Sequence, residues 1–112
     1  WERIPMVLSE SGIARDRVDR WYAERGLSPN IYAQVGGNEA IVSMVSLGFG
    51  VGVVPQLVVE NSPMRSKIEM LDVQPALEPF TIGLCVLRRK LNNPLIKAFW
   101  DLSQDHIAPG AL

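Results

Sequence analysis

The chain has 112 residues, of which 47% are hydrophobic and 21% charged, the balance of a globular domain with one buried core. Its net charge of −1 excludes a general electrostatic attraction to nucleic acid or to an anionic membrane. The single cysteine, Cys85, excludes a disulfide scaffold and fits a reducing compartment.

The first part of the chain begins with a short apolar run and a helical pattern. Residues 4–8 are apolar and predict a strand, and residues 13–25 predict a helix that Gly26 ends. One face of this helix is apolar, with side chains at helical spacing: Ala14, Val18, Trp21 and Tyr22. We expect this face to be partly buried in the core.

A second strand and helix repeat this arrangement. Residues 31–35 predict the strand, and residues 40–47 predict a mostly apolar helix with Asn38 as its N-cap. Gly48 ends that helix. Residues 50–54 then lack polar side chains, which predicts a third strand that is buried on both faces.

Residues 40–59 contain no charge and are numerous enough to span a bilayer. Their glycines and Pro55 fit a helix followed by a strand better, so we expect no membrane partner.

Gly48, Gly50 and Gly52 also resemble a dinucleotide-binding fingerprint. That motif requires a strand before the glycines and a helix after them, which is the reverse of the predicted order. We expect Gly48 to end the helix, and Gly50 and Gly52 to allow close packing of the next strand.

The remaining residues predict further strands and helices. Residues 55–60 predict a short helix and residues 68–73 a fourth strand, followed by a proline-containing connector over residues 74–79. Residues 80–87 predict a fifth strand, and residues 94–104 predict a last helix. Either Asn92 or Asn93 would cap this last helix.

Alternating strands and helices predict an α/β fold with a largely parallel sheet. The connector is a candidate boundary between two subdomains. A lone strand and helix cannot bury their apolar faces, so we expect the residues from Phe80 onward to complete a second subdomain that this chain contains only in part.

Side chains suited to catalysis or metal binding are scarce. His106 is the only histidine, and it lies in a polar tail. Histidines, cysteines and carboxylates do not occur at the spacing of metal ligands. We therefore expect no catalytic site, no metal and no cofactor.

Two strand-to-helix turns are the strongest candidates for a binding site. Their residues are small or polar: Ser9, Ser11 and Gly12 in the first turn, and Gly36, Gly37 and Asn38 in the second. Such turns lie at the carboxyl ends of parallel strands, where helix N-termini present amides to an anion. The alternative is ordinary capping, in which the polar side chains satisfy only their own helices. Arg15 could reach a bound anion or be a solvated surface charge.

Two segments resemble the effector domain of LysR-type transcription regulators. In residues 35–55, a helix ending in Leu-Gly-Phe-Gly-Val leads into a buried strand and a proline, as in that family. Residues 93–100, Asn-Pro-Leu-Ile-Lys-Ala-Phe-Trp, resemble the start of the family's C-terminal helix. The resemblance covers essentially the whole chain. Residues 31–45, 58–63 and 94–100 more narrowly resemble members that regulate isoleucine and valine synthesis.

The resemblance implies a periplasmic-binding-protein-like (type 2) fold with an effector held between two lobes. Residues 1–74 would form the second lobe, and residues 75–112 would contain the hinge crossing with the returning strand and helix of the first lobe. The effector would be a small carboxylate, acetolactate or acetohydroxybutyrate, bound by the six residues of the two turns. DNA would be bound only by a winged-helix domain outside these residues, in a cytoplasmic regulator.

The resemblance also implies self-association into a homodimer or tetramer. The matching contact surface contains residues of the predicted first helix and second strand: Val18, Trp21, Tyr22, Ile31 and Ala33. Two other classes of protein remain open from the residues alone. A solute-binding protein of the transport type shares this fold, and an α/β enzyme could hold its catalytic residues elsewhere.

Overall fold

The computed structural model describes residues 1–106 and has a mixed α/β fold with a small parallel sheet. The chain divides into two compact units, Trp1–Glu78 and Pro79–Leu112. The boundary falls within the proline-containing connector, and each unit is described below by itself.

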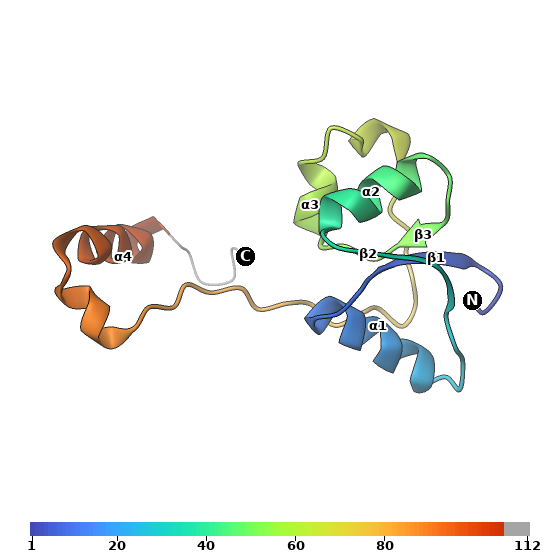
Figure 1. The fold of residues 1–112 in the computed structure, drawn as a ribbon, viewed down its shortest axis with the longest axis horizontal. Helices are drawn as coiled ribbons and strands as arrows, with labels where there is room; N and C mark the ends of the chain where they lie inside the picture. The colour runs from blue at the N-terminus through green and yellow to red at the C-terminus, as the bar shows by residue number, and fades with distance from the viewer. Residues whose placement is uncertain (107–112) are drawn as a thin grey trace. The chain divides into compact units, whose positions relative to one another are not determined.

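The first unit is built around three parallel strands in the order β2-β1-β3. These strands are β1 (Pro5–Ser9), β2 (Asn30–Val35) and β3 (Val51–Gly52). Helix α1 (Ile13–Ala23) lies on one face of the sheet, and α2 (Asn38–Ser46) and α3 (Gln56–Glu60) lie on the other (Figure 1). The central strand β1 is therefore covered on both faces, as is usual for parallel sheets.

The core follows from the alternation of side chains along β1. Met6 and Leu8 point to the face that α1 covers, and both are almost completely buried. They pack in one cluster with Val18, Trp21 and Tyr22 of α1, so the predicted burial of this helix face is confirmed. Each such side chain contributes about 1.5–3 kcal/mol when it is fully removed from water.

The ladder between β1 and β2 contains one irregular step. Met6 pairs with Ile31 and Val7 pairs with Ala33, so the register passes over Tyr32. The ring of Tyr32 stacks instead on Phe49, with ring centroids 5.6 Å apart. Beyond this β-bulge the ladder is regular again through the carboxyl ends of both strands.

Glycines shape the ends of the helices and the packing of β3. Gly26 has a φ of 64° and follows α1, which confirms its predicted role as a helix stop. A Cβ at Gly50 would lie 2.3 Å from the carbonyl oxygen of Pro5, and a Cβ at Gly52 would lie 2.5 Å from the Ile41 side chain. The prediction that Gly50 and Gly52 allow close packing is therefore confirmed.

The third strand is shorter and more exposed than we predicted. Only Val51 and Gly52 pair with β1, and residues 50–54 are all partly exposed. Because β3 lies at the edge of the sheet, it has a strand neighbour on one side only. The apolar residues of this segment indicate that it can be buried. They do not indicate whether a second strand lies beside it.

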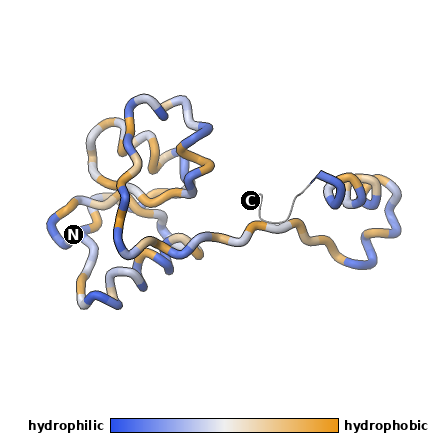
Figure 2. Tube along the Cα trace, turned by 180° about the vertical axis from the view of Figure 1, so that it is seen from behind, coloured by the Kyte–Doolittle hydropathy of each residue, from blue (hydrophilic) through white to orange (hydrophobic). Residues whose placement is uncertain are grey.

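The predicted fourth and fifth strands are wrong. Residues 68–73 and 80–87 are in neither a strand nor a helix, and side chains such as Leu71 and Ile82 are more than half exposed. The apolar stretch leading to the last helix is visible in Figure 2. A strand requires a neighbour that accepts and donates its backbone hydrogen bonds, and residues 1–106 provide none to these two segments.

The second unit contains a 3-10 helix, η2 (Arg88–Asn92), and helix α4 (Pro94–His106). Of the two predicted caps, Asn93 is the one observed, since its Oδ1 accepts a 3.0 Å hydrogen bond from the Leu95 amide. The helix continues to His106, two residues beyond its predicted end, so this histidine is helical rather than part of a tail.

Candidate functional site

The two predicted turns lie side by side at one edge of the sheet. Ser9 at the end of β1 pairs with Val35 at the end of β2, so the strands end at the same level. The amide of Glu10 donates a 3.3 Å hydrogen bond to the carbonyl oxygen of Val35, which extends the ladder into the first turn. All six predicted site residues therefore belong to neighbouring turns: Ser9, Ser11, Gly12, Gly36, Gly37 and Asn38.

A glycine with positive φ begins each helix at this edge. Gly12 precedes α1 with a φ of 101°, and Gly37 precedes α2 with a φ of 90°. Other residues rarely adopt this backbone conformation. Nothing lies within 4 Å of where a Gly12 Cβ would stand, and Gly37 has only the Glu39 carboxylate at 3.8 Å. The backbone beside both helix starts is therefore open.

Neither helix has a side-chain cap. The predicted N-cap role of Asn38 is wrong, because Gly37 occupies that position and Asn38 is the first helical residue. No serine hydroxyl caps α1 either. A glycine at the N-cap has no side-chain oxygen to accept from the first amides, so the amides that precede the first intrahelical bond need water or a ligand as an acceptor. Two uncapped helix starts at one edge form a place where a carboxylate can accept several hydrogen bonds.

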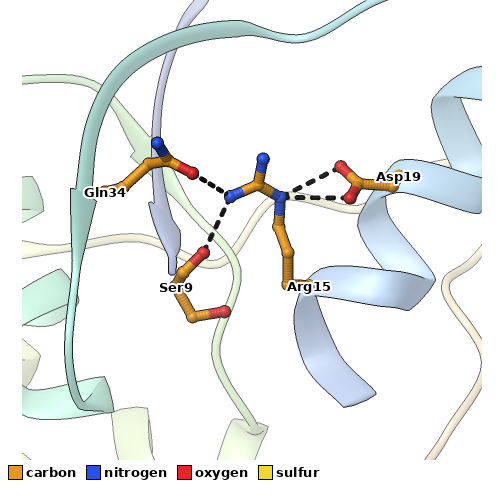
Figure 3. A network of polar contacts seen from close by, with 4 residues as sticks. All are labelled: Ser9, Arg15, Asp19 and Gln34. Carbon is orange, nitrogen blue, oxygen red and sulfur yellow. Dashed lines mark hydrogen bonds and ion pairs between the residues drawn. The ribbon is translucent and has the colours of Figure 1, made fainter. Parts of the chain in front are cut away.

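Arg15 connects the elements around the first turn (Figure 3). Its Nη1 donates to the carbonyl oxygen of Ser9 at 2.9 Å and also to Oε1 of Gln34. Its Nε donates to both carboxylate oxygens of Asp19, at 3.0 and 3.2 Å. Only 15% of the Arg15 side chain is exposed, so it is not a solvated surface charge. From the sequence, only the contact with Asp19 could be predicted, because Arg15 and Asp19 are four residues apart on one helix.

The residues expected at a dimer contact fall into two groups. Val18, Trp21 and Tyr22 are buried in the core of the first unit, whereas Ile31 is 36% exposed and Ala33 is partly exposed on β2. The hydroxyl of Tyr22 is buried without a hydrogen-bond partner among the described residues. Burial raises the pKa of this hydroxyl above its ordinary value.

The described residues contain neither a cluster of metal-binding side chains nor a helix suited to a membrane. Within residues 1–106, no group of three or more histidine, cysteine, aspartate or glutamate side chains could hold a metal ion. None of the helices in this part of the chain is both long and apolar enough to cross a membrane.

Comparison with known proteins identifies the family. The model of the LysR substrate binding domain matches residues 2–108. The chain belongs to this family. It is also 42% identical over 103 residues to the transcriptional activator IlvY of Haemophilus influenzae, covering 91% of this chain. With the regulator IlvY of Escherichia coli it shares 40% identity over 109 residues, or 95% of this chain.

The chain of this LysR domain spans only about a third of the length of these relatives. The match covers 35% of the Haemophilus protein and 37% of the Escherichia protein. A third relative, IlvY of Salmonella typhimurium, is 41% identical over 105 residues, which cover 91% of this chain and 36% of that protein. No solved structure matches the chain.

Proposed function

We propose that the chain is the ligand-sensing domain of a LysR-type transcription regulator of the IlvY kind. Its inducer would be a small carboxylate, acetolactate or acetohydroxybutyrate, and its target genes would serve branched-chain amino-acid synthesis. The family match and about 40% identity to IlvY regulators support this proposal. The single observation that carries the site is the adjacency of two uncapped, glycine-containing helix starts.

The proposed binding mode uses the amides of both helix starts. The inducer's carboxylate accepts hydrogen bonds from the backbone around Gly12 and Gly37, and the Ser9, Ser11 and Asn38 side chains bind its hydroxyl and keto oxygens. Hydrogen bonds to a charged group contribute about 1.5–3 kcal/mol each. Two or three of them, with the positive ends of both helix dipoles, are of the size that millimolar to micromolar binding requires.

Regulation follows if the inducer binds two arrangements of the protein unequally. In the proposed fold, residues 1–74 are one lobe of a periplasmic-binding-protein-like domain, and the rest of a full-length regulator supplies the other lobe. Closure of the lobes around the inducer shifts the population between two states. DNA would be bound by a separate domain of a cytoplasmic dimer or tetramer, with Ile31 and Ala33 of β2 as the accessible part of the proposed dimer contact.

The test is calorimetric titration of the full-length regulator with acetolactate, beside pyruvate and sulfate as control anions. Gly37→Val is the site variant, because a β-branched residue at a φ of 90° strains the turn and covers its amides. Gly48→Val is the matched control, since Gly48 has a φ of 86° at the other end of the same helix and open space around it.

We expect the wild-type protein and Gly48→Val to bind acetolactate, and Gly37→Val to lose binding while it stays folded. Equal loss in both glycine variants would show that backbone strain, and not the site, was responsible. If acetolactate does not bind the wild-type protein, the inducer assignment fails and other small carboxylates become the candidates.

A further inference from the structure

The geometry points to a positioning role for Arg15: its guanidinium fixes the spacing between the two turns. We propose that Arg15 joins the carboxyl ends of β1 and β2 to helix α1, and thereby holds the backbone amides of both turns in the arrangement that the effector requires. The consequence for effector binding rests on the proposed function, whereas the consequence for the geometry of the turns does not.

Three different elements provide the acceptors of this guanidinium. Ser9 is the last residue of β1, Gln34 lies one residue before the end of β2, and Asp19 is one turn further along α1. Asp19 receives two bonds from Nε, which orients the planar group, and Nη1 then donates to the other two acceptors. One rigid group therefore spans the first turn and reaches the strand that leads into the second (Figure 3).

Little else in the backbone fixes the two turns relative to one another. Beyond the Ser9–Val35 pair, the ladder between β1 and β2 continues within the described residues through the 3.3 Å bond from the Glu10 amide to the Val35 carbonyl. Glycines then follow in both turns, and a glycine restricts its own backbone less than any other residue. A carboxylate that binds both turns needs their amides within about 0.5 Å of the productive geometry. The side chain of Arg15 supplies the constraint that the glycines lack.

A positioning role makes a different prediction from an electrostatic one. Lysine keeps the positive charge of Arg15, but its single ammonium group cannot reproduce the forked, planar set of donors. An arginine that merely attracts the anion could thus be replaced by lysine, whereas one that joins three elements could not. If Arg15 contributed only to stability, its substitution would lower the melting temperature and leave the affinity of the folded protein unchanged.

The experiment compares Arg15→Lys, Arg15→Gln and Gln34→Ala in the full-length regulator. Gln34→Ala removes the connection to β2 without changing any charge. Arg20→Gln is the control, because Arg20 lies on the same helix, its side chain is 63% exposed, and it forms a long ion pair with Glu78, at 3.8 Å. Each variant is measured by hydrogen exchange of the peptide containing the Glu10 amide, by calorimetric titration with acetolactate, and by thermal unfolding.

We expect both Arg15 variants to accelerate exchange at Glu10 and to weaken acetolactate binding by about tenfold, the effect of roughly one lost charge-assisted hydrogen bond. Gln34→Ala should also accelerate exchange at Glu10 and weaken acetolactate binding, but by less. Arg20→Gln should change neither the exchange nor the affinity. Normal exchange and affinity in Arg15→Lys would overturn the proposal, as would a lower melting temperature with both unchanged. If the wild-type protein does not bind acetolactate, the proposed function fails, and exchange at Glu10 still decides the role of Arg15.

Discussion

The indole Nε1 of Trp21 donates a 2.8 Å hydrogen bond to the carbonyl oxygen of Pro75, a residue 54 positions further along the chain. Nη1 of Arg17 donates similarly to the carbonyl oxygen of Glu78, at 2.6 Å. The side chains of Trp21 and Arg17 therefore join helix α1 to residues 75–78 at the end of the first unit. Arg15, near the start of the helix, joins it to the ends of β1 and β2.

Trp21→Phe should lower the free energy of unfolding of this chain by about 1–3 kcal/mol, because it leaves the Pro75 carbonyl without its donor and replaces a buried indole with a smaller phenyl ring. Urea unfolding of the 112-residue chain measures this change. Trp1→Phe is the control, since Trp1 is 39% exposed and contacts Trp21 only edge to face. Equal effects of both substitutions would show that the bond to Pro75 contributes nothing.

Gly52→Ala should destabilise the first unit by about 1–3 kcal/mol, the usual cost of adding a methyl group to a filled space. The new Cβ would lie 2.5 Å from Cγ2 of Ile41 and 3.0 Å from Cγ2 of Val45, so β3 and α2 would have to separate. Gly83→Ala is the matched control, because nothing lies within 4 Å of its Cβ position and its φ is not positive. A stability change of the same size at Gly83 would contradict this account of Gly52.

Tyr22→Phe should leave stability at neutral pH unchanged or raise it by up to about 1 kcal/mol, since the lost hydroxyl is buried without a partner. The substitution should also change the response to alkali. Burial raises the pKa of Tyr22 above 10.0, so above about pH 10 the unfolded chain loses this proton and the folded chain keeps it.

The folded state then binds more protons than the unfolded state, and stability falls as the pH rises above 10. Unfolding measured at pH 7 and above pH 10 should show a smaller alkaline loss for Tyr22→Phe than for the wild-type chain. Tyr32→Phe serves as the control, because Tyr32 is 57% exposed. An unchanged alkaline loss in Tyr22→Phe would show that other groups cause it.

Glu39→Gln should strengthen binding of an anionic effector about three- to fivefold, because the Glu39 carboxylate lies beside Gly37 in the second turn. The gain should shrink as salt is added, since both charges face solvent. Glu60→Gln, on α3, is the control for a general change in net charge. Tighter binding in both variants would indicate a long-range effect of net charge rather than a carboxylate beside the site.

Local signals in the sequence predicted most of the first unit. Gly26 ends α1 and Asn93 caps α4 because each acts on its own helix within a few residues. The failures at residues 68–73 and 80–87 have the opposite character. An apolar run shows that a segment can pair in a sheet, but pairing also needs a neighbouring strand, and the composition of the segment cannot show whether one is present.

The candidate site was only partly predictable for the same reason. The two turns could be located because strand, glycine and helix follow one another directly in the chain. The contacts of Arg15 could not, because Gln34 is 19 residues away and reaches the guanidinium only once β1 and β2 are paired. Asn38 was misassigned by one residue because a polar residue and a glycine can each occupy an N-cap.

The bulge between β1 and β2 bears on how evolution can alter the length of this domain. Tyr32 has no partner in the ladder, and the residues on both sides of it are paired. Of the residues in β2, it is the one whose deletion would leave every remaining residue beside its present partner, at the cost of the ring that stacks on Phe49. We therefore expect homologues that are one residue shorter in this strand to lack the counterpart of Tyr32 and to keep both turns level.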